Sequence, residues 1–259
     1  TYAFGRIAAD GTVTTEGPQG LDVRALTFDS DGVLWFATAS GDPLGRRTGA
    51  STSATFGGTA SQISQPTFIT TGPDGALWFS NTGNDSIGRI TVDGAVSNFK
   101  DPSIDAPTDI VLGPDGALWF TNAGGHTIGR ITTTGVASSY YTYGVYGPSG
   151  IVAGPDGALW FTNQMQGSLG RISTAGTFTL FKQPSIKYPT DLVVGQDGAL
   201  WFTDLGTNTI GRMTTTGALS LFPIPGATGD HADRIAAAAD GTLWFGLGTE
   251  GNNAVRPES

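Results

Sequence analysis

The sequence has no cysteine among its 259 residues. The chain therefore has neither a disulfide framework nor a thiolate that could act as nucleophile or metal ligand. Positive charge is also scarce, because 13 Lys and Arg residues stand against 22 Asp and Glu residues, for a net charge of −9. An acidic surface repels polyphosphates and anionic lipids, so we expect no nucleic-acid partner and no binding to anionic membrane surfaces.

Long hydrophobic runs are absent as well. No apolar stretch approaches the roughly 20 residues that a membrane-spanning helix needs, so we expect no membrane span. The sequence begins at Thr1 without a methionine, and we expect that an upstream segment has been removed. The low lysine content and the many Ser, Thr and Gly residues favour a secreted or extracellular protein, with a cytoplasmic location as the alternative. We expect the protein to be a monomer.

The chain does contain a repeated sequence motif. Gly-Pro-Asp-Gly-Ala-Leu-Trp-Phe-Thr-Asn stands complete at Gly113–Asn122 and again at Gly154–Asn163, with looser copies elsewhere. The tryptophans of the six copies are spaced by 43, 41, 41, 41 and 43 residues; they are Trp35, Trp78, Trp119, Trp160, Trp201 and Trp244. A fixed period near forty residues indicates a repeat array.

Each repeat reads as four short strands. In residues 107–148, strands are expected at 107–112, 117–122, 127–132 and 136–141, and the Pro-Asp-Gly turn separates the first two. Leu118, Trp119 and Phe120 are consecutive, so both faces of the second strand are apolar. This pattern fits a sheet that neighbouring sheets cover on both sides, as in a propeller blade, and a stacked solenoid is the competing interpretation.

We therefore predict an all-β fold: one domain over residues 1–259, forming a six-bladed β-propeller of four-stranded antiparallel blades. Residues 12–16 would complete the last blade, so the N- and C-terminal strands close the ring and remove its exposed sheet edges. Both ends offer a third strand for this blade, at residues 4–7 and 253–256. A seven-bladed parent shortened by one blade is the alternative that would explain this surplus.

Glycine-arginine pairs mark the third strand of the repeats. The arginines are Arg6, Arg46, Arg89, Arg130, Arg171 and Arg212. Because the pair recurs once per blade, we expect a structural role in which the arginine pairs, between blades, with a buried carboxylate or carbonyl. The Asp of each Asp-Gly turn is likewise expected to form the turn rather than to act in catalysis.

The two ends of the blades differ in how regular they are. The Asp-Gly turns lie at one end, which we call the turn end, and they recur in every blade. The opposite end, which we call the variable end, carries loops that differ between blades and is the expected home of binding. Here we expect ligand-binding residues on the first strands: Arg24, Phe68, Asp109, Asp191 and Arg234.

Two further groups of residues break the repeat at the variable end. Tyr141, Tyr143 and Tyr146 crowd one connection, where aromatic rings can stack on a sugar or a flat ligand, or can simply pack between blades. In the last blade, His231 and Asp233 with the later Glu250 could bind Mg²⁺ or Ca²⁺, or act as acid and base. We expect His126, in a Gly-Gly-His loop, to be only exposed.

The repeat resembles the virginiamycin B lyase (streptogramin B lyase) family, above all at Pro66–Thr70, Ala76–Phe79 and Ile87–Thr91. The resemblance covers nearly the whole chain and implies a seven-bladed propeller that uses Mg²⁺ to linearise a cyclic depsipeptide by elimination across its ester. In such lyases the last blade carries Glu-Pro-His-Gly-Ile, in which Glu holds the metal and His is the base. The aligned segment here runs from His231 to Ile235, with His231 in the metal position, Asp233 in the base position and Glu250 on the second metal glutamate.

Three functional hypotheses follow. The first is a binding propeller of lyase ancestry, which holds a small cyclic or glycan-like ligand without turning it over, because the base position is not histidine. The second is an active C–O lyase in which His231 is the base and Asp233 and Glu250 surround Mg²⁺. The third is a non-catalytic scaffold or an engineered ring, which the near-identity of the third to fifth blades would fit.

Overall fold

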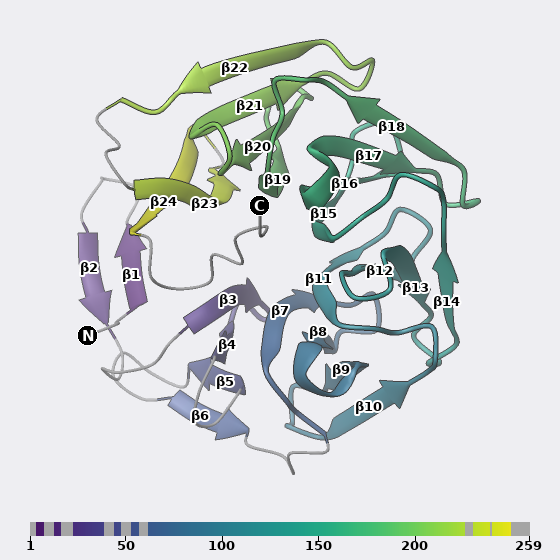
Figure 1. The fold of residues 1–259 in the computed structure, drawn as a ribbon. Coiled ribbons are helices and arrows are strands. Elements are labelled where there is room, and N and C mark those ends of the chain that lie inside the picture. Colours follow the sequence, from purple (N-terminus) through teal and green to yellow (C-terminus); the bar gives the residue numbers. More distant parts are fainter. Residues whose placement is uncertain are drawn as a thin grey trace. The chain divides into compact units, whose positions relative to one another are not determined.

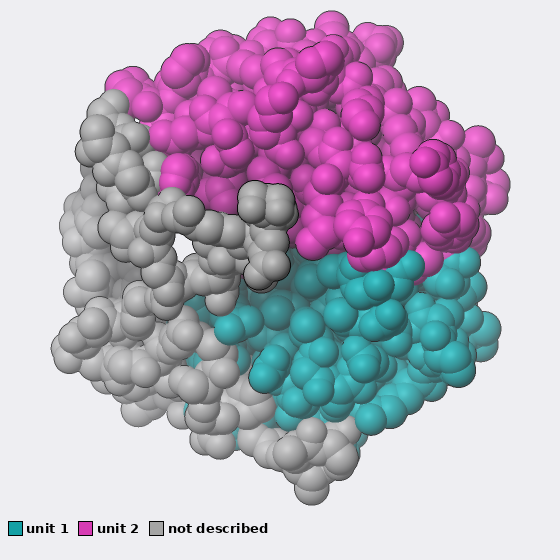
Figure 2. All heavy atoms as spheres, viewed as in Figure 1, with its two compact units in different colours: residues 1–112, 116–125, 129–139 teal, residues 113–115, 126–128, 140–259 magenta. Residues whose placement is uncertain are grey.

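The computed structural model describes residues 4–7, 13–16, 23–38, 44–47, 53–56, 62–225, 230–238 and 240–249. The chain falls into two compact units, which are described one at a time (Figure 2). Unit 1 holds residues 1–112, 116–125 and 129–139, and unit 2 holds residues 113–115, 126–128 and 140–259. No helix in the described part of the chain is long and apolar enough to cross a membrane.

Five four-stranded sheets account for the complete repeats, and each strand pairs with the next one along the chain (Figure 1). The first two sheets are β3 (Val23–Phe28), β4 (Leu34–Thr38), β5 (Leu44–Arg47) and β6 (Ser53–Phe56), then β7 (Pro66–Thr71), β8 (Leu77–Asn81), β9 (Ser86–Ile90) and β10 (Val96–Lys100). The third is β11 (Pro107–Leu112), β12 (Leu118–Asn122), β13 (Thr127–Ile131) and β14 (Ala137–Tyr140).

The last two complete sheets belong to unit 2. They are β15 (Pro148–Ala153), β16 (Leu159–Asn163), β17 (Ser168–Ile172) and β18 (Phe178–Lys182), then β19 (Pro189–Val194), β20 (Leu200–Asp204), β21 (Thr209–Met213) and β22 (Leu219–Pro223). Two hairpins complete the strand list: β1 (Phe4–Ile7) with β2 (Val13–Glu16), and β23 (Asp230–Ala237) with β24 (Leu243–Thr249). Short 3-10 turns stand at Thr82–Asn84 and Gln164–Gln166.

The second strand of each complete sheet carries the core. All five residues of β16 are buried, as are those of β8 and β12, which explains why Leu, Trp and Phe follow one another without alternation. The Trp160 ring stacks on Phe181 of β18 at 5.0 Å between ring centroids. By contrast, Trp244 of β24 is 57% exposed.

The glycine of each Gly-Arg pair has a packing cause. The ring of Phe161 lies against Gly170, so a Cβ atom at residue 170 would stand 2.0 Å from the ring. Real side chains do not approach so closely, and only glycine leaves the ring its place. The same pairing recurs in the other complete sheets, as Phe36 with Gly45, Phe79 with Gly88, Phe120 with Gly129 and Phe202 with Gly211.

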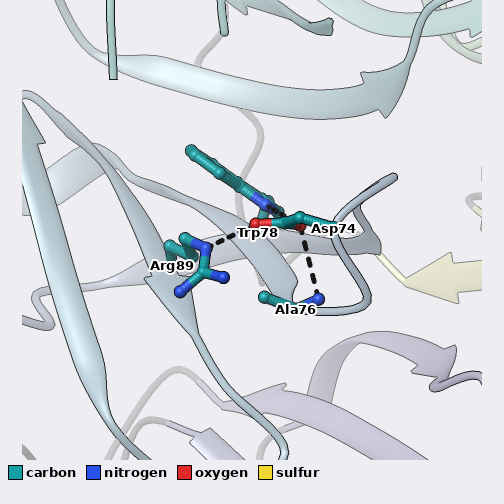
Figure 3. A network of polar contacts seen from close by, with 4 residues as sticks. All are labelled: Asp74, Ala76, Trp78 and Arg89. Carbon is teal, nitrogen blue, oxygen red and sulfur yellow. Dashed lines mark hydrogen bonds and ion pairs between the residues drawn. The ribbon is translucent and has the colours of Figure 1, made fainter. Parts of the chain in front are cut away.

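The arginine of the pair reaches the turn of its own blade. Asp74 accepts hydrogen bonds from Trp78 Nε1 at 3.0 Å, Arg89 Nε at 2.6 Å and Ala76 N at 3.4 Å (Figure 3). Burial opposes ionisation, yet the hydrogen bonds from Trp78 and Arg89 hold the pKa of Asp74 below its ordinary value. One carboxylate thus fastens the turn, the second strand and the third strand together.

This arrangement repeats with Asp156, Trp160 and Arg171, and with Asp197, Trp201 and Arg212. The predicted structural role of the arginines is confirmed for these blades, but the predicted location between blades is wrong there, because the partner is the carboxylate of the blade's own turn. Arg46 does follow that expectation, since its Nη1 donates to the carbonyl of Val92 in the next blade at 2.6 Å.

The first complete blade shows why Arg46 differs. Its Trp35 donates to Asp29, which stands two residues before the Asp-Gly pair, at 2.8 Å. Asp29 also accepts from the backbone N–H groups of Asp31 and Val33. The carboxylate has moved within the turn, and Arg46 bonds a backbone carbonyl of the next blade.

The predicted fold class is confirmed as all-β with one four-stranded antiparallel sheet per complete repeat. Together, β1–β2 and β23–β24 contain the four strands that a sixth blade needs. The competing third strand predicted at residues 253–256 lies outside the described residues. That the chain is a single domain stays a prediction.

Candidate functional site

A buried asparagine fixes the loops at the variable end. At the end of β16, Asn163 Oδ1 accepts from Tyr146 N at 2.7 Å, and its Nδ2 donates to the carbonyl of Gly144 at 2.7 Å. Asn81 and Asn122 hold the matching loops of their blades in the same way, and Asp204 accepts from Lys187 N and Tyr188 N. The loops vary in sequence, but each is fixed to the end of a second strand.

Threonine hydroxyls link the first strands of neighbouring blades within unit 2. Thr162 Oγ1 donates to the carbonyl of Thr190 at 3.0 Å. In the next blade along, the carbonyl of Asp233 accepts from Thr190 Oγ1 at 3.2 Å and from Thr203 Oγ1 at 3.3 Å. These contacts set the position of β23 against β19.

Asp191, on β19, makes the second link to β23. Its Oδ2 accepts from Ile235 N at 3.0 Å, and its Oδ1 accepts from Leu192 N at 2.9 Å. Burial raises the pKa of Asp191, while the nearby charge of Arg234 acts in the opposite direction and that of Asp233 adds to the rise. Asp191 is thus a half-buried carboxylate that holds the backbone of the last hairpin.

The predicted pair Asp233 and Arg234 lies on a β-bulge. The register of β23 with β24 shifts between Ala232 and Arg234, which leaves Asp233 as the extra residue. The other first strands shift register at the equivalent place, so the bulge belongs to the repeat, and the feature particular to β23 is that two charged residues occupy it. Both side chains are exposed, so the variable end of unit 2 presents a carboxylate and a guanidinium on a backbone that Asp191, Thr190 and Thr203 hold in place.

The structure supports only part of the predicted metal set. His231 is half-buried on β23, two residues before Asp233, and Glu250 lies outside the described residues. Among the described residues there is no group of three or more His, Asp or Glu side chains placed to hold a metal ion. The residues that the structure describes therefore do not make a Mg²⁺ site, and the metal stays a prediction.

The predicted tyrosines line a pocket of their own. Tyr141, Tyr143 and Tyr146 follow β14 and border a cavity of about 380 Å³. The other lining side chains include Gln166, Ser168 and Lys182, on the next blade. Their exposed fractions are 69% for Tyr141, 91% for Tyr143 and 46% for Tyr146. None of Asp191, Asp233 and Arg234 lines this pocket.

Two further aromatic residues lie next to this pocket in the sequence or contact its lining. Tyr140 packs between blades, because its ring lies against Gly176 in the turn of the next blade. The expectation that His126 is only exposed is wrong. It is half-buried, its ring centroid lies 3.9 Å from that of Tyr146, and its Nδ1 accepts from Gly147 N at 3.2 Å. A left-handed φ of 54° at His126 belongs to this loop.

The remaining predicted ligand residues belong to unit 1. Asp109 is buried, with its Oδ1 accepting from Ile110 N at 2.7 Å. Phe68 packs against the core cluster that contains Trp78 and Ile110, and Arg24 is half-buried on β3. These contacts give Phe68 a packing role, and the predicted ligand-binding roles of all three stay predictions.

Sequence reasoning missed the pocket residues Gln166, Ser168 and Lys182, and it missed His126 as a support for Tyr146. The signal for Lys182 was present, since it occupies the position in its repeat that Tyr141 occupies one repeat earlier. The His126 contact joins two loops that follow different strands, and no spacing rule reveals it.

Comparisons with known proteins agree with the repeat. The model of the virginiamycin B lyase family matches residues 141–256, and the model of the two-component regulator propeller matches residues 17–40. Among curated proteins, no sequence matches the chain significantly. The WD40 β-propeller domain of Doa1 superposes with a TM-score of 0.71 at 12% identity, over 91% of this chain and 79% of that one, which supports the fold alone.

Two solved structures are similar in sequence as well. One is a catalytically inactive histidine-to-alanine variant of virginiamycin B lyase from Staphylococcus aureus with quinupristin, at 35% identity and a TM-score of 0.84, over 94% of this chain and 84% of that one. The other is a streptogramin B lyase, at 31% identity and a TM-score of 0.85, over 94% of this chain and 83% of that one. A propeller is thereby confirmed over a solenoid, with six blades fitting the observed sheets, and the chain belongs to the virginiamycin B lyase family.

Proposed function

We propose that the protein binds a small cyclic depsipeptide at the variable end of unit 2 and holds it without opening its ring. The observation that carries the proposal is the anchored bulge at Asp233 and Arg234. Its backbone is fixed by Thr190, Thr203 and Asp191, while both charged side chains are exposed. A relative at 35% identity has been solved with quinupristin, which supports a ligand of this class.

The chemistry of the bulge suits such a ligand. A cyclic depsipeptide presents amide and ester carbonyls together with amide N–H groups. The Arg234 guanidinium can donate to two carbonyl oxygens in its fixed fork geometry, and the Asp233 carboxylate can accept from amide N–H groups. Because the backbone beneath them is already fixed, little conformational entropy would be lost on binding.

Catalysis of ring opening requires more of the site than binding does. Elimination across the ester requires a base to take a proton from carbon while the C–O bond breaks, a C=C bond forms and the carboxylate leaves. Family resemblance puts Asp233 in the position of that base, and Asp233 is exposed. A water-exposed carboxylate is a poor base toward a carbon acid. We therefore expect binding to persist where catalysis is lost.

The test is a calorimetric titration with quinupristin. We expect the wild type to bind, and Arg234→Ala and Asp233→Ala each to weaken binding by about tenfold, which corresponds to about 1.4 kcal/mol. Lys100→Ala, an exposed cation on the fourth strand of another blade, is the matched control and should leave the affinity unchanged. Equal affinity in wild type and Arg234→Ala would contradict the proposal.

An active lyase is the second candidate, because His231 lies on the same strand, two residues from Asp233. In that case incubation with quinupristin and MgCl₂ would yield a linear isomer of unchanged mass, resolved by chromatography and tandem mass spectrometry. His231→Ala would abolish the product. If neither binding nor product is found, the scaffold hypothesis is favoured instead.

A further inference from the structure

We propose that unit 2 carries a second ligand site, in the pocket of Tyr141, Tyr143, Tyr146 and Lys182, and that this site binds a short glycan bearing a carboxylate. We call it the tyrosine pocket. It shares no lining residue with the Asp191, Asp233 and Arg234 group. The proposal is independent of the depsipeptide site and would stand if that site bound nothing.

The repeat itself shows that the tyrosines are additions to a standard loop. Three connections from a fourth strand to the next first strand have the same length and the same turn: Ile104 N bonds the carbonyl of Asp101, Val145 N that of Thr142, and Ile186 N that of Gln183. The three central apolar residues, Ile104, Val145 and Ile186, are buried in all of them. The scaffold of the loop is therefore satisfied without any tyrosine.

The three exposed positions of this loop are the ones that change. One connection carries Lys100, Pro102 and Asp105, another carries Lys182, Pro184 and Lys187, and the connection between them carries Tyr141, Tyr143 and Tyr146. All nine side chains are exposed. Three aromatic rings have thus replaced charged or rigid residues where the fold needs none, and exposed aromatic clusters commonly mark binding surfaces.

One of the rings is held in place. The ring of Tyr146 packs at a tilt of 37° against that of His126, whose Nδ1 accepts from Gly147 N, and the backbone N–H of Tyr146 donates to Asn163 Oδ1. A ring fixed in this way offers a flat apolar face at low entropic cost. The rings of Tyr141 and Tyr143 remain open, with 69% and 91% exposure, so a ligand could cover them.

The lining selects the ligand class. Flat ring faces match the C–H face of a sugar, while the tyrosine hydroxyls, Gln166 and Ser168 provide groups for its hydroxyls. Lys182 is the one charged residue that lines the pocket, in a chain with a net charge of −9. Its ammonium group would form an ion pair with a carboxylate on the ligand. A volume of about 380 Å³ lies at the lower end of the usual range for ligand pockets and suits a few sugar rings.

The probe is trigalacturonate, titrated calorimetrically, with neutral cellotriose in parallel. We expect the wild type to bind trigalacturonate more tightly than cellotriose. Tyr143→Ala should weaken trigalacturonate binding at least tenfold, and Lys182→Gln should weaken it about fivefold while leaving cellotriose binding unchanged. Arg234→Ala should leave both affinities unchanged, which separates this site from the depsipeptide site.

A loop exchange provides the matched control for folding. The combined variant Tyr141→Lys, Tyr143→Pro and Tyr146→Asp installs the residues of the sister connection 100–106, which adopts the same turn. Its thermal unfolding should match that of the wild type, and trigalacturonate binding should be lost. Trigalacturonate binding that survives the exchange, the absence of binding in the wild type up to about 10 mM, or binding that is lost in Arg234→Ala would each overturn the proposal.

Discussion

The two ends of one blade follow opposite rules. At the turn end of β15–β18, Asp156 ties Trp160 to Arg171, and the same three residue types do so at Asp74 and Asp197. At the variable end, equivalent loop positions hold lysine, tyrosine, proline or aspartate. Side chains therefore fix both ends, but they do so differently. At the turn end they bond one another, whereas at the variable end Asn163 and its equivalents bond the loop only at its backbone atoms, so the exposed loop side chains can change.

The largest effect is expected from overfilling the shared core. Gly170→Ala would place a methyl group 2.0 Å from the ring of Phe161, which is fully buried in the core. We expect a loss of about 3 kcal/mol or more in the free energy of unfolding, measured by urea denaturation. Gly246→Ala, in a strand where an added Cβ meets nothing within 4 Å, is the matched control and should cost under about 1 kcal/mol. Equal losses in both variants would refute the packing explanation.

Next in size is the loss of a turn carboxylate. Asp156→Ala removes the acceptor of Trp160 Nε1 and Arg171 Nε, and we expect a loss of about 2 kcal/mol in the free energy of unfolding. Asp93→Ala, at an exposed Asp-Gly pair of a different turn, is the control and should stay within about 0.5 kcal/mol.

The same carboxylate gives a pH test. Despite the opposing effect of burial, hydrogen bonds from Arg171 and Trp160 lower the pKa of Asp156 below its ordinary value of 3.8. A carboxylate with a lowered pKa stabilises the fold above its unfolded pKa, and this stability is lost as the pH falls through the folded pKa. The stability gap between wild type and Asp156→Ala should therefore narrow below about pH 4. A gap that is constant down to pH 2 would show that the carboxylate charge is not involved.

At the variable end, Asp191 should respond in the opposite sense. Burial raises its pKa, so the folded protein holds this proton more tightly than the unfolded chain, and stability falls as the pH rises from about 4 through the raised pKa. The amide that the Asp191→Asn substitution introduces cannot ionise. The melting temperature of the variant relative to the wild type should therefore rise between pH 3 and pH 7, whatever the fixed cost of one altered hydrogen bond. A difference that falls with pH would contradict this assignment.

The smallest effect on stability is expected at the bulge. Arg234 is exposed and its charge acts on Asp191, so Arg234→Ala should change the free energy of unfolding by no more than about 1 kcal/mol while it weakens quinupristin binding. A large loss of stability would place Arg234 with the turn-end residues and remove the contrast between the two ends.

Most of the fold could be predicted from the periodicity of the sequence. The spacing of Trp35 to Trp244 and the unbroken Leu-Trp-Phe runs predict four-stranded blades, because a strand buried on both faces cannot alternate. The site was harder to predict. That Asp191 bonds the backbone of Ile235 depends on two strands 44 residues apart, and the ring contact between His126 and Tyr146 depends on two loops. Neither contact leaves a local pattern in the sequence.

One tryptophan stands apart from its sisters. Trp35, Trp78, Trp119 and Trp160 are fully buried and Trp201 is half-buried, whereas Trp244 is 57% exposed. A collisional quencher such as acrylamide would therefore extinguish the fluorescence of Trp244 first. Every blade of this protein carries the same fluorophore, yet the emission that solvent can reach would report chiefly on the last hairpin.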